Sequence, residues 1–318
     1  MKTPLLAGES FYSVRYNDQE IQTVLKEKLM SNPFDPQLLA DDLCEVHRIY
    51  SDFFSHLNME TWEKPVRGGS KEWSQHETVA HLCALTGAGL ESIRHTLRDE
   101  TYVFDGLTDR YHFNAYNRHG IDEHLLLPTK ELCAEFLNIL EETACIARNL
   151  RPDQVDLVSE MPIYNRPVKI VEAMGILIFH AGLHHSAQVA EPAGVPPLWN
   201  QLSPEIRHRV VGRVMRALSL LYRYDLGGDL RTVIVFKIDG PGGGCWYVDV
   251  SPHGTTSREG IADGPGLTLH MRKTDIFCQM FTGRLNLPLV LLTGQLKLRG
   301  NLRLFPRFGS LFSVDARS

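Results

Sequence analysis

Apolar residues recur at helical spacing along the first 200 residues, and the pattern then changes to the alternation typical of strands. Four stretches carry the helical pattern, at residues 35–57, 74–97, 130–149 and 167–190. Because four amphipathic or buried helices pack readily side by side, we expect a four-helix bundle. Residues 1–34 are expected to form an extended or irregular arm. The aromatic and polar residues 99–127 are expected to form a long loop.

Two of these helices have clear N-terminal signals. Asp35 supplies a capping carboxylate in front of Pro36, which suits the first helical turn. Ser74 and Glu77 form the S-x-x-E pattern of a capping box, which places His81 about two turns into the second helix. The fourth stretch is apolar on nearly every face, so its helix must lie inside the bundle.

The second part of the chain begins after a change in composition at residues 191–203, EPAGVPPLWNQLS, where prolines end the helix and indicate a linker. A helix is expected over residues 204–224. RTVIVFKID and CWYVDVSP then predict two strands joined by a glycine-rich turn, and GLTLHMRK and QLKLRGN predict two more. Short helices are expected at DIFCQMFTG and LRLFPRFGSLF. We therefore expect a multidomain α and α+β protein, with an arm (1–34), a bundle (35–200) and an α+β domain (201–318).

Composition limits the class of protein. The 318 residues are 43% hydrophobic and 22% charged, as in soluble globular proteins. The net charge of −5, without a basic stripe, argues against a nucleic-acid partner. Six cysteines without C-x-x-C spacing predict reduced thiols. No apolar run suits a signal core or a membrane span, so we expect a cytoplasmic location. The sequence leaves a homodimer open.

Three histidines are the strongest candidates for chemistry. His180 and His184 are four residues apart on the fourth helix, and His81 lies on the second. Buried imidazoles need partners for both ring nitrogens, and a divalent metal is one such partner. Three imidazoles would leave coordination positions open for catalysis. The alternative is a set of core histidines bonded to backbone or water, because one such pair among 14 histidines is expected by chance.

Two neighbouring residues complicate this assignment. His185 adjoins His184, and a shift of one residue in the helix register would exchange them. We favour His184, because a spacing of four keeps both imidazoles on one face and a spacing of five turns them apart. Cys83 is turned away from the ligand face by its offset of two from His81, so we expect no nucleophilic cysteine there.

Three other residues are candidates for binding a small-molecule substrate. Tyr116 and Asn117 lie on the expected loop and would line the entrance to the site. Arg299 would bind a substrate carboxylate through its planar guanidinium. The alternative for the first two is loop packing, and for Arg299 it is ordinary surface charge.

Both parts of the chain resemble known families. Residues 36–200 resemble a DinB-type bundle through the W-S-x-x-E-x-x-x-H-L element at residues 73–82 and an H-x-x-x-H element on the last helix. Residues 205–318 resemble a sterol-carrier-protein type domain through VIVFKIDGPGGGCWYVDV and LTGQLKLRGNLRLFPRFGSLF. The same order of domains is known in mycothiol-dependent maleylpyruvate isomerase and its relatives. The resemblance implies three metal ligands, at the positions of His81, His180 and His184.

The resemblance also shapes the expected function. The isomerase pattern has glutamate at the position of His180, so the ligand set is more similar to that of the three-histidine thiol transferases of the same superfamily. We expect a metal-dependent enzyme with zinc as the default ion and a low-molecular-weight thiol as a second cofactor. Such an ion makes a coordinated thiol a thiolate at neutral pH, which suits thiol transfer, thiol addition or isomerisation on a small hydrophobic or unsaturated substrate.

Two alternative functions stay open. The same ion would activate water in a hydrolase or a lyase. The chain would instead be a sterol-carrier-like binding protein for an apolar ligand if the metal were structural or absent. A third possibility is that the second domain is a lid or a dimerisation element for the first, with its apolar closing helix around Phe305, Phe308 and Phe312 packed against the bundle. This possibility keeps the function of an enzyme.

Overall fold

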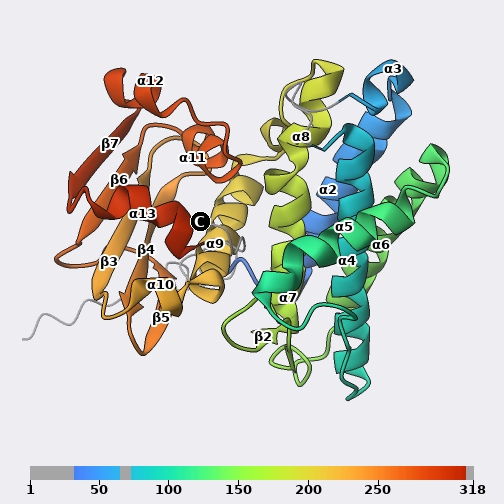
Figure 1. Cartoon of the computed structure of the whole chain (residues 1–318), viewed down its shortest axis with the longest axis horizontal. Coiled ribbons are helices and arrows are strands. Elements are labelled where there is room, and N and C mark those ends of the chain that lie inside the picture. The colour runs from blue at the N-terminus through green and yellow to red at the C-terminus, as the bar shows by residue number, and fades with distance from the viewer. Residues whose placement is uncertain (1–31, 65–72, 313–318) are drawn as a thin grey trace, which may run out of the picture. The chain divides into compact units, whose positions relative to one another are not determined.

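The computed structural model describes residues 32–64 and 73–312 (Figure 1). The expected arm, residues 1–34, lies almost entirely outside the described residues. A helical part comes first and a part built on a mixed sheet follows, so the expected multidomain α and α+β class is confirmed.

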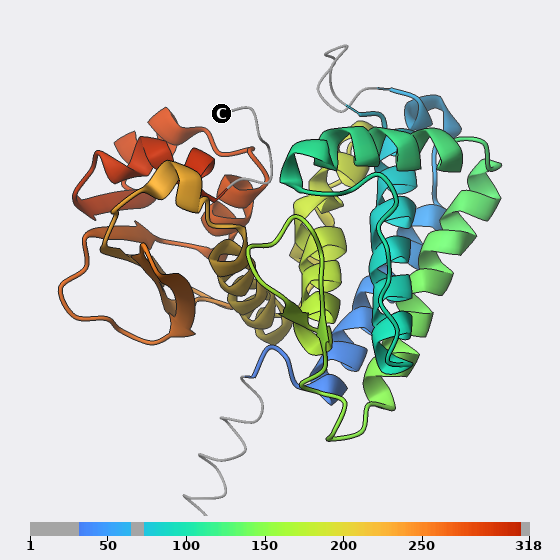
Figure 2. The ribbon, with the colours of Figure 1, turned by 60° about the horizontal axis from the view of Figure 1, so that its bottom comes forward.

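The helical part contains the four long helical segments that the apolar pattern predicts (Figure 2). They are α2 (Pro36–Ser55), α4 (Gln75–Leu97), α6 (Thr129–Arg148), and a last segment made of α7 (Ile170–Phe179), η2 (His180–His184) and α8 (Ser186–Ala190). A short α3 (Met59–Trp62) and a two-stranded ladder of β1 (Val158–Ser159) and β2 (Val168–Lys169) accompany them. Both expected caps are present: Asp35 accepts from two backbone amides, and Ser74 and Glu77 form a reciprocal capping box.

The expected loop at residues 99–127 is partly wrong, because it contains η1 (Arg110–His112) and α5 (Phe113–His124). Asp109 starts this segment by accepting hydrogen bonds from the backbone amides of Tyr111 and His112. The buried side chains of α5 are Asn117 and Ile121 alone, so its sequence lacks a regular apolar stripe. The apolar pattern therefore gave no helical signal there.

The second part is a five-stranded sheet in the order β5-β4-β3-β6-β7, in which only β3 and β6 run parallel. Its strands are β3 (Thr232–Ile238), β4 (Gly244–Ser251), β5 (Gly254–Glu259), β6 (Leu267–Met271) and β7 (Leu296–Gly300). Its helices are α9 (Pro204–Leu221), α10 (Tyr224–Gly227), α11 (Thr274–Phe281), α12 (Leu287–Leu292) and α13 (Leu304–Leu311). Strand β5 was not expected, because only Thr255 of its six residues is buried and the apolar alternation is missing.

Helix α9 is shared by the two parts. It packs against β4 and β5 of the sheet and also against α7 of the bundle (Figure 1). The approach to α7 is close at Gly175, where a Cβ atom would come within 3.3 Å of Cγ of Arg213 and 2.8 Å of the Phe34 ring. A boundary between residues 200 and 201 therefore stays a prediction, since α9 buries side chains on both sides.

Buried ion pairs between charged side chains connect α9 to α2. Asp42 is completely buried, and its carboxylate accepts from Nε of Arg209 at 2.9 Å. A terminal nitrogen of Arg213 lies 2.7 Å from the same carboxylate, and Nε of Arg213 donates to the carbonyl of Pro33 at 2.9 Å. Two guanidinium groups thus depend on one buried carboxylate for their neutralisation.

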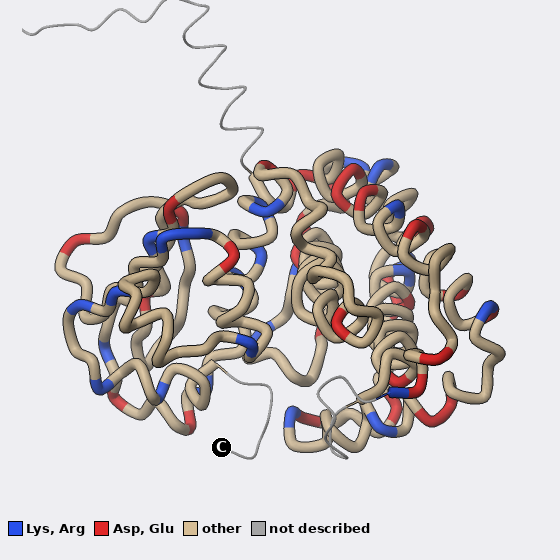
Figure 3. Tube along the Cα trace, turned by 90° about the horizontal axis from the view of Figure 1, so that it is seen from above, with Lys and Arg blue, Asp and Glu red and all other residues tan. Residues whose placement is uncertain are grey.

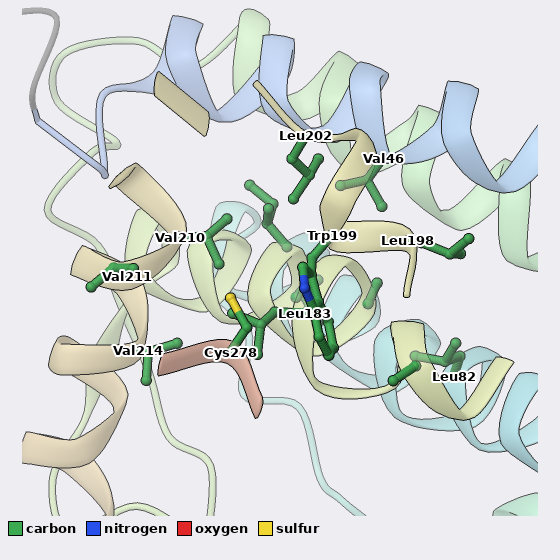
Figure 4. Close-up of a cluster of buried hydrophobic side chains, with 14 of the residues drawn as sticks. Val46, Leu82, Leu183, Leu198, Trp199, Leu202, Val210, Val211, Val214 and Cys278 are labelled. Atoms are coloured by element: carbon green, nitrogen blue, oxygen red, sulfur yellow. The ribbon is translucent and has the colours of Figure 1, made fainter. Parts of the chain in front are cut away.

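The linker between the parts contributes a buried aromatic side chain. The linker forms two short turns, η3 (Glu191–Ala193) and η4 (Leu198–Gln201). Trp199 is only 1% exposed and lies beside Leu183 and Cys278 in the cluster shown in Figure 4. Its indole nitrogen donates to Asp275 at the start of α11, at 3.1 Å. The linker is therefore packed into the core and is not a free tether.

Along the backbone trace, Lys and Arg positions are interspersed with Asp and Glu positions in both parts (Figure 3). Within residues 32–64 and 73–312, none of the helices combines the length and the apolarity that crossing a membrane requires.

We predict that Asp42→Ala destabilises the protein by about 3–5 kcal/mol, because it leaves two buried guanidinium groups without their counter-charge. Chemical denaturation followed by circular dichroism measures this change. The neighbouring Asp41→Ala is the matched control, since the side chain of Asp41 is 55% exposed and should contribute no more than about 0.5 kcal/mol. Equal denaturation midpoints for the two variants would contradict the assigned role of the buried cluster.

Candidate metal centre and its cavity

The last helix of the bundle contains a π turn at the histidines. The backbone amide of His185 donates to the carbonyl of His180 at 3.1 Å, a bond across five residues rather than four. The extra residue widens this turn, so residues five apart come to share one face. The α-helical spacing that favours His184 over His185 therefore does not apply here.

The structure brings together His81, His180 and His185. One ring nitrogen from each lies within 4.8 Å of the other two. Nε2 of His81 lies 3.1 Å from Nε2 of His180. The expected set named His184, but its ring is stacked beside that of His180 with centroids 6.2 Å apart and does not join this cluster.

Burial keeps these imidazoles neutral. The pKa of His81 is held well below its ordinary value, first by burial and then by the neighbouring His185 and His184. Burial likewise lowers the pKa of His180 and of His185 well below the ordinary value, with the adjacent histidines adding to the effect. A neutral imidazole has a lone pair free for a metal, so the cluster is in the protonation state that coordination requires.

The tautomer of His185 is set by Gln188. Nδ1 of His185 is hydrogen-bonded to Oε1 of Gln188. Because this oxygen can only accept, Nδ1 carries the proton and Nε2 keeps its lone pair. Nδ1 of His81 and Nδ1 of His180 are buried and have no hydrogen-bond partner within the described chain.

The histidines form one wall of a cavity of about 500 Å³, here called the histidine cavity. Trp73 lies over the cluster, with its ring centroid 4.6 Å from that of His81. Helices α4, α5, α7, α9, α11 and α13 all contribute to the lining. The lining residues are Trp73, His81, Leu85, Phe113, Asn114, Asn117, Met161, Ile163, Tyr164, Ile176, Leu177, Phe179, His180, His184, His185, Val214, Ala217, Leu218, Leu221, Met280, Phe281, Phe308, Gly309 and Phe312.

The other candidate residues fall in different places. Asn117 lines the histidine cavity, is buried, and has no hydrogen-bond partner for Oδ1 within the described chain. Tyr116 lines a second, more acidic cavity between α4, α5 and α6, where burial raises its pKa to about 12. Arg299 is exposed on β7 and does not line the histidine cavity. Cys83 is buried, and its thiol donates to the carbonyl of Leu132 at 3.4 Å.

Sequence reasoning missed Trp73 as a cover, Gln188 as a partner of His185, and Phe281 on α11. Gln188 follows His185 by three residues on one helix, so the pair was visible in the sequence once His185 was chosen. Phe308 and Phe312 belong to the apolar closing helix that was expected to pack against the bundle, whereas no local pattern marks Phe281.

Comparison with known sequences identifies the C-terminal part. Residues 224–313 match the SCP-2 sterol transfer family. Hydroxysteroid dehydrogenase-like protein 2 of Homo sapiens is 27% identical over 118 residues, which are 37% of this chain and 28% of that protein. The Bos taurus protein of the same name is 27% identical over 104 residues, or 33% of this chain and 25% of that protein. The chain thus matches about a quarter of the length of these relatives.

Comparison with solved structures covers both parts. The crystal structure of the mycothiol-dependent maleylpyruvate isomerase superposes with a TM-score of 0.52 at 11% identity, covering 78% of this chain and 89% of that one. A histidine-to-alanine mutant of that isomerase gives a TM-score of 0.53 at 10% identity, with 83% and 92% covered. At these identities the likeness shows the fold, and the expected order of a helical part and an SCP-2 domain is confirmed.

Proposed function

We propose that this protein is a metal-dependent enzyme that performs thiol addition or transfer, or an isomerisation by reversible thiol addition, on a small unsaturated substrate. The observation that carries the proposal is the convergence of three neutral imidazoles on the wall of a largely apolar cavity. The isomerase with a similar fold is named as mycothiol-dependent, which supports the thiol part of the proposal.

The proposed ligands are His81, His180 and His185. Two nitrogens bound to one zinc ion at tetrahedral angles lie about 3.3 Å apart, and Nε2 of His81 and Nε2 of His180 are separated by 3.1 Å. The same distance suits an N–H···N hydrogen bond, which is the alternative for a metal-free pair. Three protein ligands leave a position for an exogenous group, as in catalytic rather than structural sites.

The ion, when bound, would supply a Lewis acid that favours the thiolate form of a coordinated thiol. The chain's own residues supply the surroundings. Trp73 covers the imidazoles, and the apolar lining excludes water from the reacting groups. Gln188 holds His185 in the tautomer that presents Nε2.

We predict that His81→Ala and His185→Ala lose the bound metal, whereas His184→Ala retains it at the wild-type ratio. Only the first two remove a nitrogen from the cluster. Elemental analysis of proteins purified without chelator measures the content, and circular dichroism checks the fold. Metal retained in His185→Ala but lost in His184→Ala would show that the ligand is His184. Wild-type protein that holds no metal even after reconstitution would end the proposal.

We predict that Gln188→Leu lowers the metal affinity about 10- to 100-fold, because His185 then loses the acceptor that fixes its tautomer. Gln188→Glu keeps an acceptor at the same place and should retain the wild-type affinity. Competition with a chromophoric chelator measures both constants. Equal affinities for wild type and Gln188→Leu would show that Gln188 has no positioning role.

We predict that the cobalt-loaded protein develops a sulfur-to-cobalt charge-transfer band when N-acetylcysteine is added, because an open ligand position accepts a thiolate. The spectrum of His81→Ala under the same conditions is the control. A cobalt spectrum that responds to pH but not to thiol would favour the hydrolase or lyase alternative, in which the ion activates water.

A further inference from the structure

Helix α12 of the SCP-2 part is anchored mainly through one buried side chain. Asn286 caps the helix by accepting a hydrogen bond from the backbone amide of Leu289 at 3.2 Å, and Pro288 lies in the first turn. Val290 is only 4% exposed and belongs to the main hydrophobic core. Figure 1 shows the helix next to β7, the edge strand of the sheet. Val290 therefore fixes which face of α12 is turned inward.

The side chains on either side of Val290 are exposed leucines, here called the leucine patch. Leu289 is 51% exposed, Leu291 is 40% exposed and Leu292 is 87% exposed. Single exposed apolar residues are ordinary on soluble proteins, whereas three of them within one helical turn form a contiguous apolar surface. Such a surface marks a site of interaction with a partner.

Exposed cations lie beside the turn that follows the leucine patch. A Cβ atom built on Gly294 would lie 3.9 Å from Cε of Lys297, so the lysine side chain reaches back to this turn. The backbone amide of Arg272 donates to the carbonyl of Gln295 at 2.9 Å, which places Arg272 and Lys273 at the same end of the sheet. Arg272, Lys273 and Lys297 are exposed, and none of the three forms an ion pair within the described chain.

The acids at this end of the sheet have partners of their own. Asp239 is paired with Nε2 of His270 at 2.7 Å, and the carboxylate of Asp275 accepts two side-chain hydrogen bonds. From residue 276 to residue 312 the sequence has five Arg and Lys residues and no Asp or Glu, although the net charge of the whole chain is −5. The segment around the leucine patch is thus positively charged in an acidic protein.

We propose that the leucine patch is a docking surface for a membrane with anionic headgroups. Its leucines would enter the boundary of the acyl chains, while the neighbouring cations bind the lipid phosphates. A helix of six residues lies on such a surface and does not cross it. A second copy of this chain fits the leucine patch less well, because the cations of the two copies would repel each other. The proposal is independent of the metal and of the proposed reaction.

Binding of the full-length protein to vesicles tests this surface. Vesicles of phosphatidylcholine mixed with phosphatidylglycerol are compared with vesicles of phosphatidylcholine alone, and bound protein is measured by cosedimentation. We expect at least about 10-fold stronger partition onto the anionic vesicles at low salt, and most of this preference should disappear when salt screens the headgroups. Equal partition onto both kinds of vesicle, or binding to neither, would overturn the proposal.

Paired substitutions test the leucines. Leu291→Gln combined with Leu292→Gln should weaken partition onto the anionic vesicles about 10-fold, because two apolar side chains no longer leave water. The control is Leu126→Gln combined with Ile261→Gln, at positions that are 84% and 86% exposed elsewhere on the protein, and it should bind as the wild type does. Circular dichroism checks that both variants are folded. Variants that bind equally well would show that the leucine patch does not enter the membrane.

A second pair of substitutions tests the cations. Lys273→Gln combined with Lys297→Gln should weaken partition about five-fold for each lysine removed. The control, Lys64→Gln combined with Lys130→Gln, removes two exposed lysines from the helical part and should have no such effect. Equal weakening by both pairs would reduce the binding to net charge and contradict a local docking surface. A dimer that depends on Leu291 and Leu292, in protein that does not bind vesicles, would assign the leucine patch to a contact between copies instead.

Discussion

Asp42 is the residue on which the arrangement of the two parts depends. Its buried carboxylate pairs with Arg209 and Arg213, and both arginines belong to α9, which also packs against the sheet. Buried charges that lose their partner are strongly destabilising, so the contact between these three side chains admits little variation in geometry. The same helix contributes Val214, Ala217 and Leu218 to the wall of the histidine cavity. By fixing the position of α9, the charge cluster therefore also fixes this wall.

The composition of the histidine cluster depends on one extra residue in one helical turn. A regular α-helix would align His180 with His184, whereas the π turn brings His185 to the cluster and leaves His184 beside it. Such turns are rare, and they frequently lie at functional sites. Helix α7, which is apolar except for Glu172 and largely buried, precedes this turn.

The sequence predicted what depends on local periodicity and capping. Ser74 and Glu77 marked the start of α4, and the alternating residues of β3 and β4 marked a hairpin that the structure contains. His81 and His180 were found because they lie on strongly patterned helices. The π turn had no local signal, and α5 and β5 are too polar to show a period. Phe281 reaches the histidine cavity only through tertiary packing, which no local sequence pattern indicates.

Because of helix α9, the start of the family match does not coincide with the start of the segment that packs together with the sheet. The match to the SCP-2 family begins at residue 224, after α9 has ended, yet β4 and β5 are covered by that helix. A fragment that starts at residue 224 would expose the sheet surface that α9 covers, and a bundle that ends at residue 203 would lose the partner of Asp42. Recombination of either part with another protein would thus have to carry α9 along, so the histidine cluster and the SCP-2 sheet are expected to be inherited together.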